Sequence, residues 1–227
     1  RPPALVREHE YSLLNREPHN LDLDDERGAQ AELTYANLAG WTALVNASRS
    51  ERHEGDLFTG DPLFAELYGR LEKDEVGPLR LRSAFGYQEY EKGHIRQTGV
   101  AELGWYLDPV HAVTVTGEHQ HVRMGEGSDP SSNLGAYDQD LIKLEITVAP
   151  TWAFVGLLEM NNKYREQFSR NEQSGPFPAV QVAYSSPRGT TLSLWAGKRQ
   201  AGQLCSGGVC KIEPAFEGVE LTGIFRY

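Results

Sequence analysis

Hydrophobic and polar residues alternate with a period of two along most of the chain. The last run shows this most clearly, because one side of it is mainly apolar and consists of Val219, Leu221, Gly223, Phe225 and Tyr227. A two-residue period places successive side chains on opposite faces of an extended strand. The pattern therefore predicts strands that have one apolar and one polar face.

Runs of this kind are separated by segments that contain glycine or proline, which is typical of β-rich proteins. Strands are predicted at residues 32–38, 41–51, 64–73, 79–90, 99–107, 111–122, 138–149, 152–163, 179–185, 190–200 and 217–227. Residues 4–13 are a further candidate. Very little of the sequence has a helical period, so the chain is predicted to be all-β with about 11–12 strands.

The connections between these strands differ in length. Short ones are predicted near residues 39–40, 73–78, 108–110, 150–151 and 186–189. They alternate with longer polar segments near residues 52–63, 91–98, 123–137, 164–178 and 201–216. An up-and-down meander with short turns at one end and long loops at the other is typical of outer-membrane barrels. Most strands are also long enough for the ~9–11 residues that a tilted strand needs to cross a bilayer.

The fold class predicted from these features is an antiparallel up-and-down transmembrane β-barrel. Its charged face is predicted to line a lumen, with Glu66, Arg70, Glu72, Arg80, Arg82, Glu102, Lys143, Glu145, Glu220 and Arg226. Its apolar face is predicted to contact lipid or the membrane interface, with Trp105, Ile142, Leu144, Ile146, Phe225 and Tyr227. Alternation alone fits a soluble sandwich equally well. Aromatic residues near strand ends favour the membrane interpretation.

Composition narrows the function classes. The formal net charge of -10 argues against a nucleic-acid partner, which normally meets a basic surface. No stretch approaches the ~18–20 apolar residues of a membrane helix. The 227 residues fit a single barrel domain spanning 1–227.

The two cysteines, Cys205 and Cys210, are separated by a glycine-containing turn. A disulfide between them is predicted to clip the last outer loop, and it implies an oxidising compartment. Two unpaired thiols in a cytosolic protein are the alternative.

Candidate chemistry is sparse. His119 and His121 share one face of a strand and form half a metal site, for which His94 or His111 would have to supply partners. The acidic run at residues 22–26 is either a loose calcium chelator or a solvated loop. No nucleophile or metalloprotease motif occurs. No enzyme activity, cofactor or metal is therefore predicted.

Two stretches resemble an uncharacterised family of outer-membrane β-barrel proteins from Bacteroidetes-type, Gram-negative bacteria: LVREHEYSLLNREPHNLDLDDERGAQAELTYA and AGKRQAGQLCSGGVCKIEPAFEGVELTGIFRY. The more specific part is the CSGGVC element, followed by Pro214, Phe216, Gly218 and a strand that ends on an aromatic residue. Members of that family are longer. The resemblance thus implies that residues 1–227 are the C-terminal part of a larger, N-terminally incomplete barrel. It brings no catalytic residues.

The predicted function is that of an outer-membrane protein, either porin-like and passing small polar solutes, or a structural barrel subunit of an outer-membrane assembly. Its predicted partners are outer-membrane lipid and other outer-membrane or periplasmic subunits. The alternative is a secreted or surface β-sandwich that binds carbohydrate through tryptophan and tyrosine side chains.

Overall fold

A computed structural model describes ten parts of the chain. They are residues 9–16, 26–37, 39–52, 63–90, 93–125, 135–162, 176–187, 189–200, 202–206 and 209–225. Strands and turns account for almost all of these residues, and none of them lies in an α-helix. The all-β prediction is therefore confirmed for the described part of the chain.

The described residues form thirteen strands. They are β1 (Glu26–Ala36), β2 (Trp41–Arg52), β3 (Phe64–Val76), β4 (Leu79–Tyr90), β5 (His94–Tyr106), β6 (His111–Arg123), β7 (Ala136–Val148), β8 (Trp152–Asn161), β9 (Phe177–Ser185), β10 (Thr191–Arg199), β11 (Gly202–Ser206), β12 (Val209–Glu213) and β13 (Phe216–Ile224). Each of the eleven predicted strands overlaps one of them. Most boundaries agree within a few residues.

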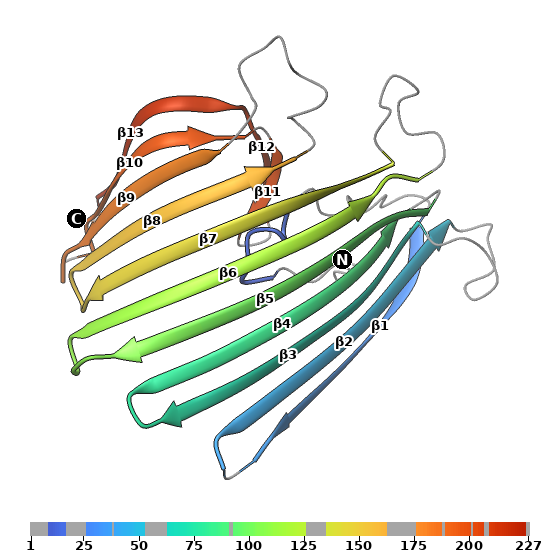
Figure 1. Ribbon diagram of the computed structural model, residues 1–227, viewed down its shortest axis with the longest axis horizontal. Coiled ribbons are helices and arrows are strands. Elements are labelled where there is room, and N and C mark those ends of the chain that lie inside the picture. Colours follow the sequence, from blue (N-terminus) through green and yellow to red (C-terminus); the bar gives the residue numbers. More distant parts are fainter. Residues whose placement is uncertain are drawn as a thin grey trace.

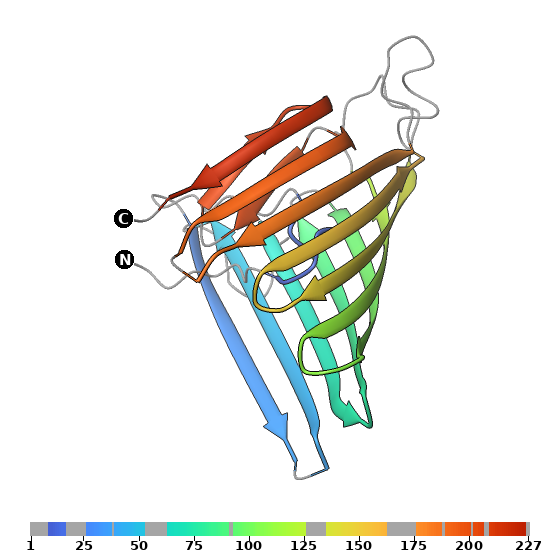
Figure 2. The same cartoon turned by 90° about the vertical axis from the view of Figure 1, so that its left-hand side faces the viewer.

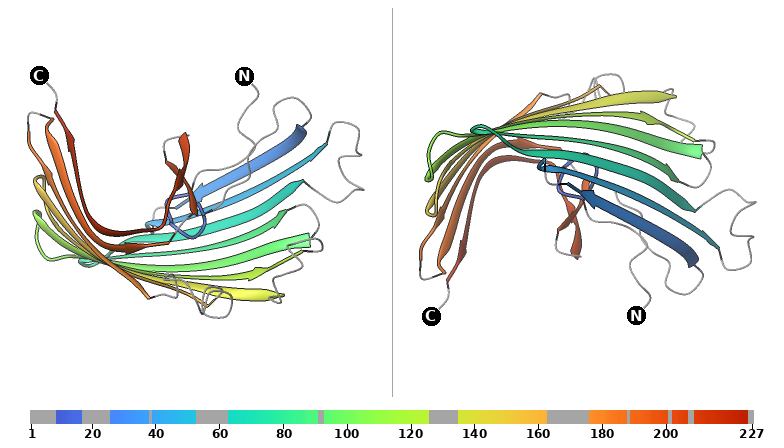
Figure 3. Two further views of the ribbon diagram at one scale, coloured as in Figure 1. Left: turned by 90° about the horizontal axis from the view of Figure 1, so that it is seen from above. Right: turned by 90° about the horizontal axis from the view of Figure 1, so that it is seen from below.

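Eleven strands make one sheet in the order β1-β2-β3-β4-β5-β6-β7-β8-β9-β10-β13, and every neighbouring pair is antiparallel (Figure 1). The predicted up-and-down meander is confirmed. The sheet bends into a deep trough in which β1 and β13 are the two outer strands (Figures 2 and 3). Since β1 and β13 do not pair, the sheet described here is open rather than a closed barrel.

One predicted loop is wrong. Strand β4 ends at Tyr90 and β5 begins at His94, so the connection spans only residues 91–93 instead of 91–98. Gly93 has a φ of 75°, a left-handed conformation that suits a tight turn. The start of β5 is rich in polar residues, and it has the composition of a loop although it pairs along its length with β4.

The segment predicted as the last outer loop, residues 201–216, contains the β11–β12 hairpin. This hairpin is a separate two-stranded sheet that lies on the concave side of the trough (Figure 3). Its strands are short and follow no clear alternation, which is why the sequence pattern does not reveal them.

The candidate strand at residues 4–13 is also wrong where the structure describes it. Residues 9–16 form turns, in which the Asn15 N–H donates to the Tyr11 carbonyl at 3.3 Å and the Arg16 N–H donates to the Leu13 carbonyl at 3.4 Å. The adjacent residues Leu13 and Leu14 are both buried. An extended strand would place these neighbours on opposite faces.

The turn between β5 and β6 is held by Asp108. Its carboxylate accepts hydrogen bonds from the N–H groups of Val110 at 2.8 Å and His111 at 2.9 Å. These two N–H groups, together with the His111 ring, lower the pKa of Asp108 below its usual value. The short connection predicted at residues 108–110 is thus an Asx-type turn.

The polar face of the sheet is the more buried of its two faces. Most buried residues other than a small apolar cluster are polar, among them Asn46, Ser50, Thr98, Thr116 and Gln120. Many large apolar side chains at the alternate positions of the same strands, such as Val45, Leu103 and Val115, are exposed on the convex side. Soluble sheets usually bury the apolar face.

Candidate functional site

Residues 9–16 are seated on the concave face, where they cross the inside of the trough (Figure 3). The strands whose side chains hydrogen-bond to this segment run from β3 to β8. The segment and the polar side chains beneath it are the candidate functional site, and we call residues 9–16 the seated segment.

The middle of the seated segment is bound through its main chain. Glu118 of β6 accepts hydrogen bonds from the N–H groups of Ser12 at 3.1 Å and Leu13 at 2.7 Å. Gln120, two residues further along the same face, donates to the Leu13 carbonyl at 2.8 Å. Bonds between N–H groups and a carboxylate are charge-assisted and stronger than neutral ones.

Two further carbonyls of the segment find donors on neighbouring strands. Gln88 of β4 donates to the Leu14 carbonyl at 3.4 Å, and Arg96 of β5 donates to the Arg16 carbonyl at 2.7 Å. Gln88 and Arg96 stand directly opposite each other in the antiparallel register. The sheet therefore presents rows of donors and acceptors to the main chain of the segment.

Charged side chains anchor the first residues. His9 Nε2 lies 2.7 Å from Glu66 Oε1, and both side chains are almost completely buried. Glu66 also accepts a hydrogen bond from Gln88 at 2.8 Å. Glu10 forms ion pairs with Arg70 and Arg82 at the rim of the buried region.

Arg16 anchors the other end. Its guanidinium makes two contacts with the Glu159 carboxylate, one of them at 3.0 Å between Nη2 and Oε2, and it donates to Gln139 at 3.1 Å. Gln200 also donates to Glu159. The two charged side chains are 11% and 6% exposed, so the pair is largely shielded from solvent.

Apolar contacts also hold the seated segment on the sheet. Leu14 belongs to a buried cluster with Tyr11, Leu44, Tyr68, Ala84 and Val100. It packs directly onto Gly86, where a Cβ atom would collide with the Leu14 side chain. A glycine at this place in β4 therefore provides the room that Leu14 occupies.

Most predicted lumen residues lie in or beside this site. Glu66 and Glu72 are buried, and Arg70 and Arg82 contact Glu10 of the segment. Arg80 and Arg82 also form ion pairs with Glu102. On other strands, Lys143 pairs with Glu145 at 3.8 Å and Glu220 pairs with Arg199 at 3.3 Å. Arg226 lies outside the described residues.

Sequence reasoning did not select six residues whose side chains hydrogen-bond to the seated segment: Gln88, Arg96, Glu118, Gln120, Gln139 and Glu159. A signal for them was present, because they share the two-residue phase of the predicted charged face. Residues of this phase lie opposite one another, as in the pairs Glu66–Gln88 and Gln120–Gln139.

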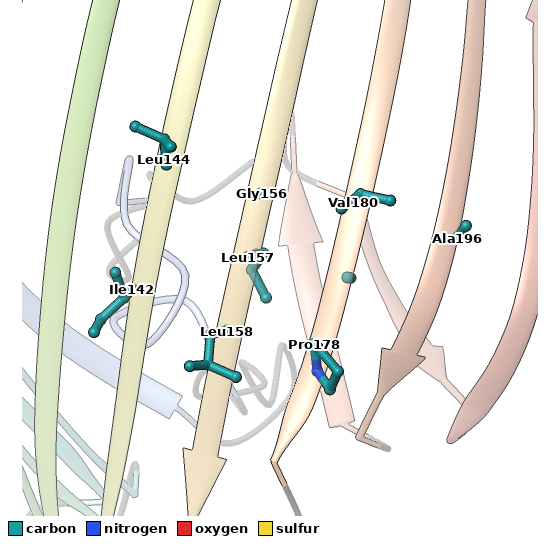
Figure 4. Close-up of a pocket in the computed structure, with 9 residues that line it drawn as sticks. Ile142, Leu144, Gly156, Leu157, Leu158, Pro178, Val180 and Ala196 are labelled. Atoms are coloured by element: carbon teal, nitrogen blue, oxygen red, sulfur yellow. The ribbon is translucent and has the colours of Figure 1, made fainter.

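The residues predicted to face lipid lie on the convex side. Trp105, Ile142, Leu144 and Ile146 are between 42% and 51% exposed, and Phe225 is exposed as well. Tyr227 lies outside the described residues. A shallow groove of about 460 Å³ interrupts this face beside Gly156, which lies between Leu144 and Val180 (Figure 4). Only apolar residues line the groove, so it offers no group for chemistry.

The histidine pair does not form the suggested metal site. His119 bonds to Asp140 at 2.8 Å and His121 to Asp138 at 2.7 Å, on the exposed convex side of β6 and β7. Neither bonds to His94 or His111. The described residues contain no group of three potential ligands placed to hold a metal ion. Of the acidic run at residues 22–26, only Glu26 belongs to the described residues.

Cys205 and Cys210 stand directly opposite each other in the β11–β12 register. This backbone arrangement is compatible with the predicted disulfide, which stays a prediction. We expect the thiols to resist alkylation until a reductant is added, as followed by mass spectrometry. Labelling of both thiols in the unreduced protein, prepared from an oxidising compartment, would contradict it.

Within the described residues, no helix is both long enough and apolar enough to span a membrane. Comparison with curated proteins and with solved structures finds no match. A family model described as a family of unknown function (DUF6029) matches residues 2–227. The chain, with its meandering sheet and seated segment, therefore belongs to the DUF6029 family.

Proposed function

We propose that this protein is an outer-membrane β-barrel whose convex face contacts lipid and whose concave face surrounds a polar lumen. One observation carries the proposal. Leu81, Leu103, Val115 and Leu144 lie directly opposite one another on β4 to β7, and each is 42–43% exposed. An unbroken apolar row of this kind is costly in water, at about 25 cal/mol per Å² of apolar surface.

The residues found on either side of this apolar row, toward the two ends of the strands, also support the proposal. Near the short turns the convex face carries aromatic side chains, including Trp105 and the contacting pair Trp152 and Tyr184. Toward the opposite strand ends it carries ion pairs such as His119–Asp140. Aromatic residues at the membrane interface and charges beyond it are typical of outer-membrane barrels.

Hydrocarbon imposes a further requirement. A spanning sheet must pair every backbone N–H and C=O group, so a sheet edge cannot face lipid. In this proposal β1 and β13 therefore each pair with a further strand, and the described sheet forms part of the wall of a larger barrel.

The lumen suits small polar solutes, because carboxylates, guanidinium groups and amides line it. A structural barrel subunit is the second candidate. It is favoured by the seated segment, which occupies the concave face with closely packed side chains.

Gel mobility tests the membrane assignment. The full-length protein, extracted with detergent, should migrate differently before and after heating, because a folded barrel resists unfolding by dodecyl sulfate. It should also partition into the detergent phase. A protein that is soluble without detergent and shows one mobility would refute the proposal and favour the carbohydrate-binding β-sandwich. That alternative requires two packed sheets, whereas the main sheet described here is a single layer.

A further inference from the structure

We propose that the concave face is a peptide-binding site and that the seated segment is its built-in ligand, which closes the lumen. The inference rests on the proposed barrel and names the ligand class of that lumen. The ligand is a short peptide turn that has a histidine-like donor at one end and a basic side chain at the other.

The contacts are those expected of peptide recognition. Five main-chain atoms of the segment are bound by sheet side chains: the nitrogens of Ser12 and Leu13 and the oxygens of Leu13, Leu14 and Arg16. Main-chain bonds of this kind give affinity for any peptide that adopts the same turn. They do not depend on the side chains of the ligand.

Side-chain contacts add selectivity. Each end of the segment binds a buried carboxylate: His9 binds Glu66, and Arg16 binds Glu159. Between them, the space above Gly86 accepts Leu14. A peptide without the basic residue would leave Glu159 buried without its cation, which is strongly unfavourable.

The bound segment crosses the middle of the trough. Its anchors lie on β3 for His9, on β6 for Leu13 and on β8 for Arg16, so the chain crosses six consecutive strands. A segment that crosses the inner wall over this distance, with both leucines fully buried, obstructs a lumen there.

Tethering explains why the site is occupied. A covalently attached ligand has an effective concentration on the order of millimolar, so even a modest intrinsic affinity fills the site. In a variant that lacks the segment, the same peptide supplied separately should half-fill the site at a concentration equal to its own dissociation constant.

The test replaces residues 9–16 of the full-length protein with a glycine–serine segment of equal length. In liposomes, permeation of small polar solutes should rise by at least about tenfold over the wild type. Adding the synthetic peptide HEYSLLNR should restore the barrier, whereas a scrambled peptide of the same composition should not. Folding of each protein is checked by heat-modifiable mobility.

Point variants in the replaced protein test the site itself. Glu159→Gln should weaken rescue by the peptide by about ten- to a hundredfold, because it removes the charge that Arg16 meets. Glu217→Gln is the matched control, since its exposed carboxylate on β13 pairs with Lys198 and not with the segment. Rescue should be unchanged in this control.

Unchanged permeation in a folded replacement variant would overturn the inference, because the segment then does not close the lumen. Increased permeation without rescue by the peptide would overturn the peptide site. Both results leave the proposed barrel intact, whereas loss of heat-modifiable mobility in the wild type refutes the barrel itself. Where the replacement does not fold, Gly86→Leu tests closure alone: it takes the space of Leu14 and should raise permeation, and unchanged permeation would overturn the inference.

Discussion

Replacing Leu144 with arginine should destabilise the folded protein in a lipid bilayer by about 2–4 kcal/mol. Leu144 lies on the convex face of β7, 43% exposed, directly opposite Val115 and Gly156. If this face meets hydrocarbon, the arginine must either leave its charge in the bilayer or distort its surroundings to reach water. Denaturant titration in phospholipid vesicles, followed by tryptophan fluorescence, measures the change in unfolding free energy.

Glu145→Arg is the matched control for this substitution. It introduces the same side chain at the next residue, on the polar face, and removes a half-exposed contact with Lys143. Losing such a contact costs at most about 1 kcal/mol. If the convex face meets water instead, Leu144→Arg should change stability by no more than about 0.5 kcal/mol, as most surface substitutions do. Equal effects of the two variants would contradict the lipid-facing assignment.

Replacing Arg16 with methionine should release the seated segment. Removing one partner of a buried ion pair costs about 3–5 kcal/mol, because the remaining charge stays buried without compensation. Glu159 would retain only the hydrogen bond from Gln200. Exchange of the Leu13 amide proton, which the Glu118 carboxylate protects, should accelerate by roughly a hundredfold or more. Hydrogen exchange followed by mass spectrometry measures this change.

The double variant Arg16→Met with Glu159→Leu should recover most of the lost protection, since replacing both charges by apolar groups is often close to neutral. Arg199→Met is the control for loss of an arginine elsewhere on the sheet, because its pair with Glu220 is partly exposed. Exchange at Leu13 should be unaffected there. If Arg16→Met leaves exchange at Leu13 unchanged, the buried pair does not hold the segment.

The sheet itself was predictable because strand alternation is a local property. Each strand from β1 to β10, and β13, has its own two-residue pattern, and short connections such as Asp108–Val110 carry their own turn chemistry. Predictions failed where local composition misleads. The polar start of β5 has loop-like composition, and the β11–β12 hairpin is held by pairing between its strands rather than by a pattern within either.

The site was only half predictable for a related reason. The two-residue alternation along each strand identifies which residues share the charged face, and the predicted set therefore included Glu66, Arg70 and Arg82. The importance of Glu118 and Glu159 depends on what lies above them, and the seated segment precedes these residues by more than a hundred positions in the chain. No local pattern in HEYSLLNR reports that it folds back onto six strands.

The sequence by itself therefore determined the strands, their two faces and the meandering order, since these follow from side-chain alternation and short-range turns. Tertiary structure alone decided that the sheet bends into an open trough and that residues 9–16 occupy its inner face. These features arise from sheet twist and from contacts between residues far apart in the chain, which alternation along a strand does not encode.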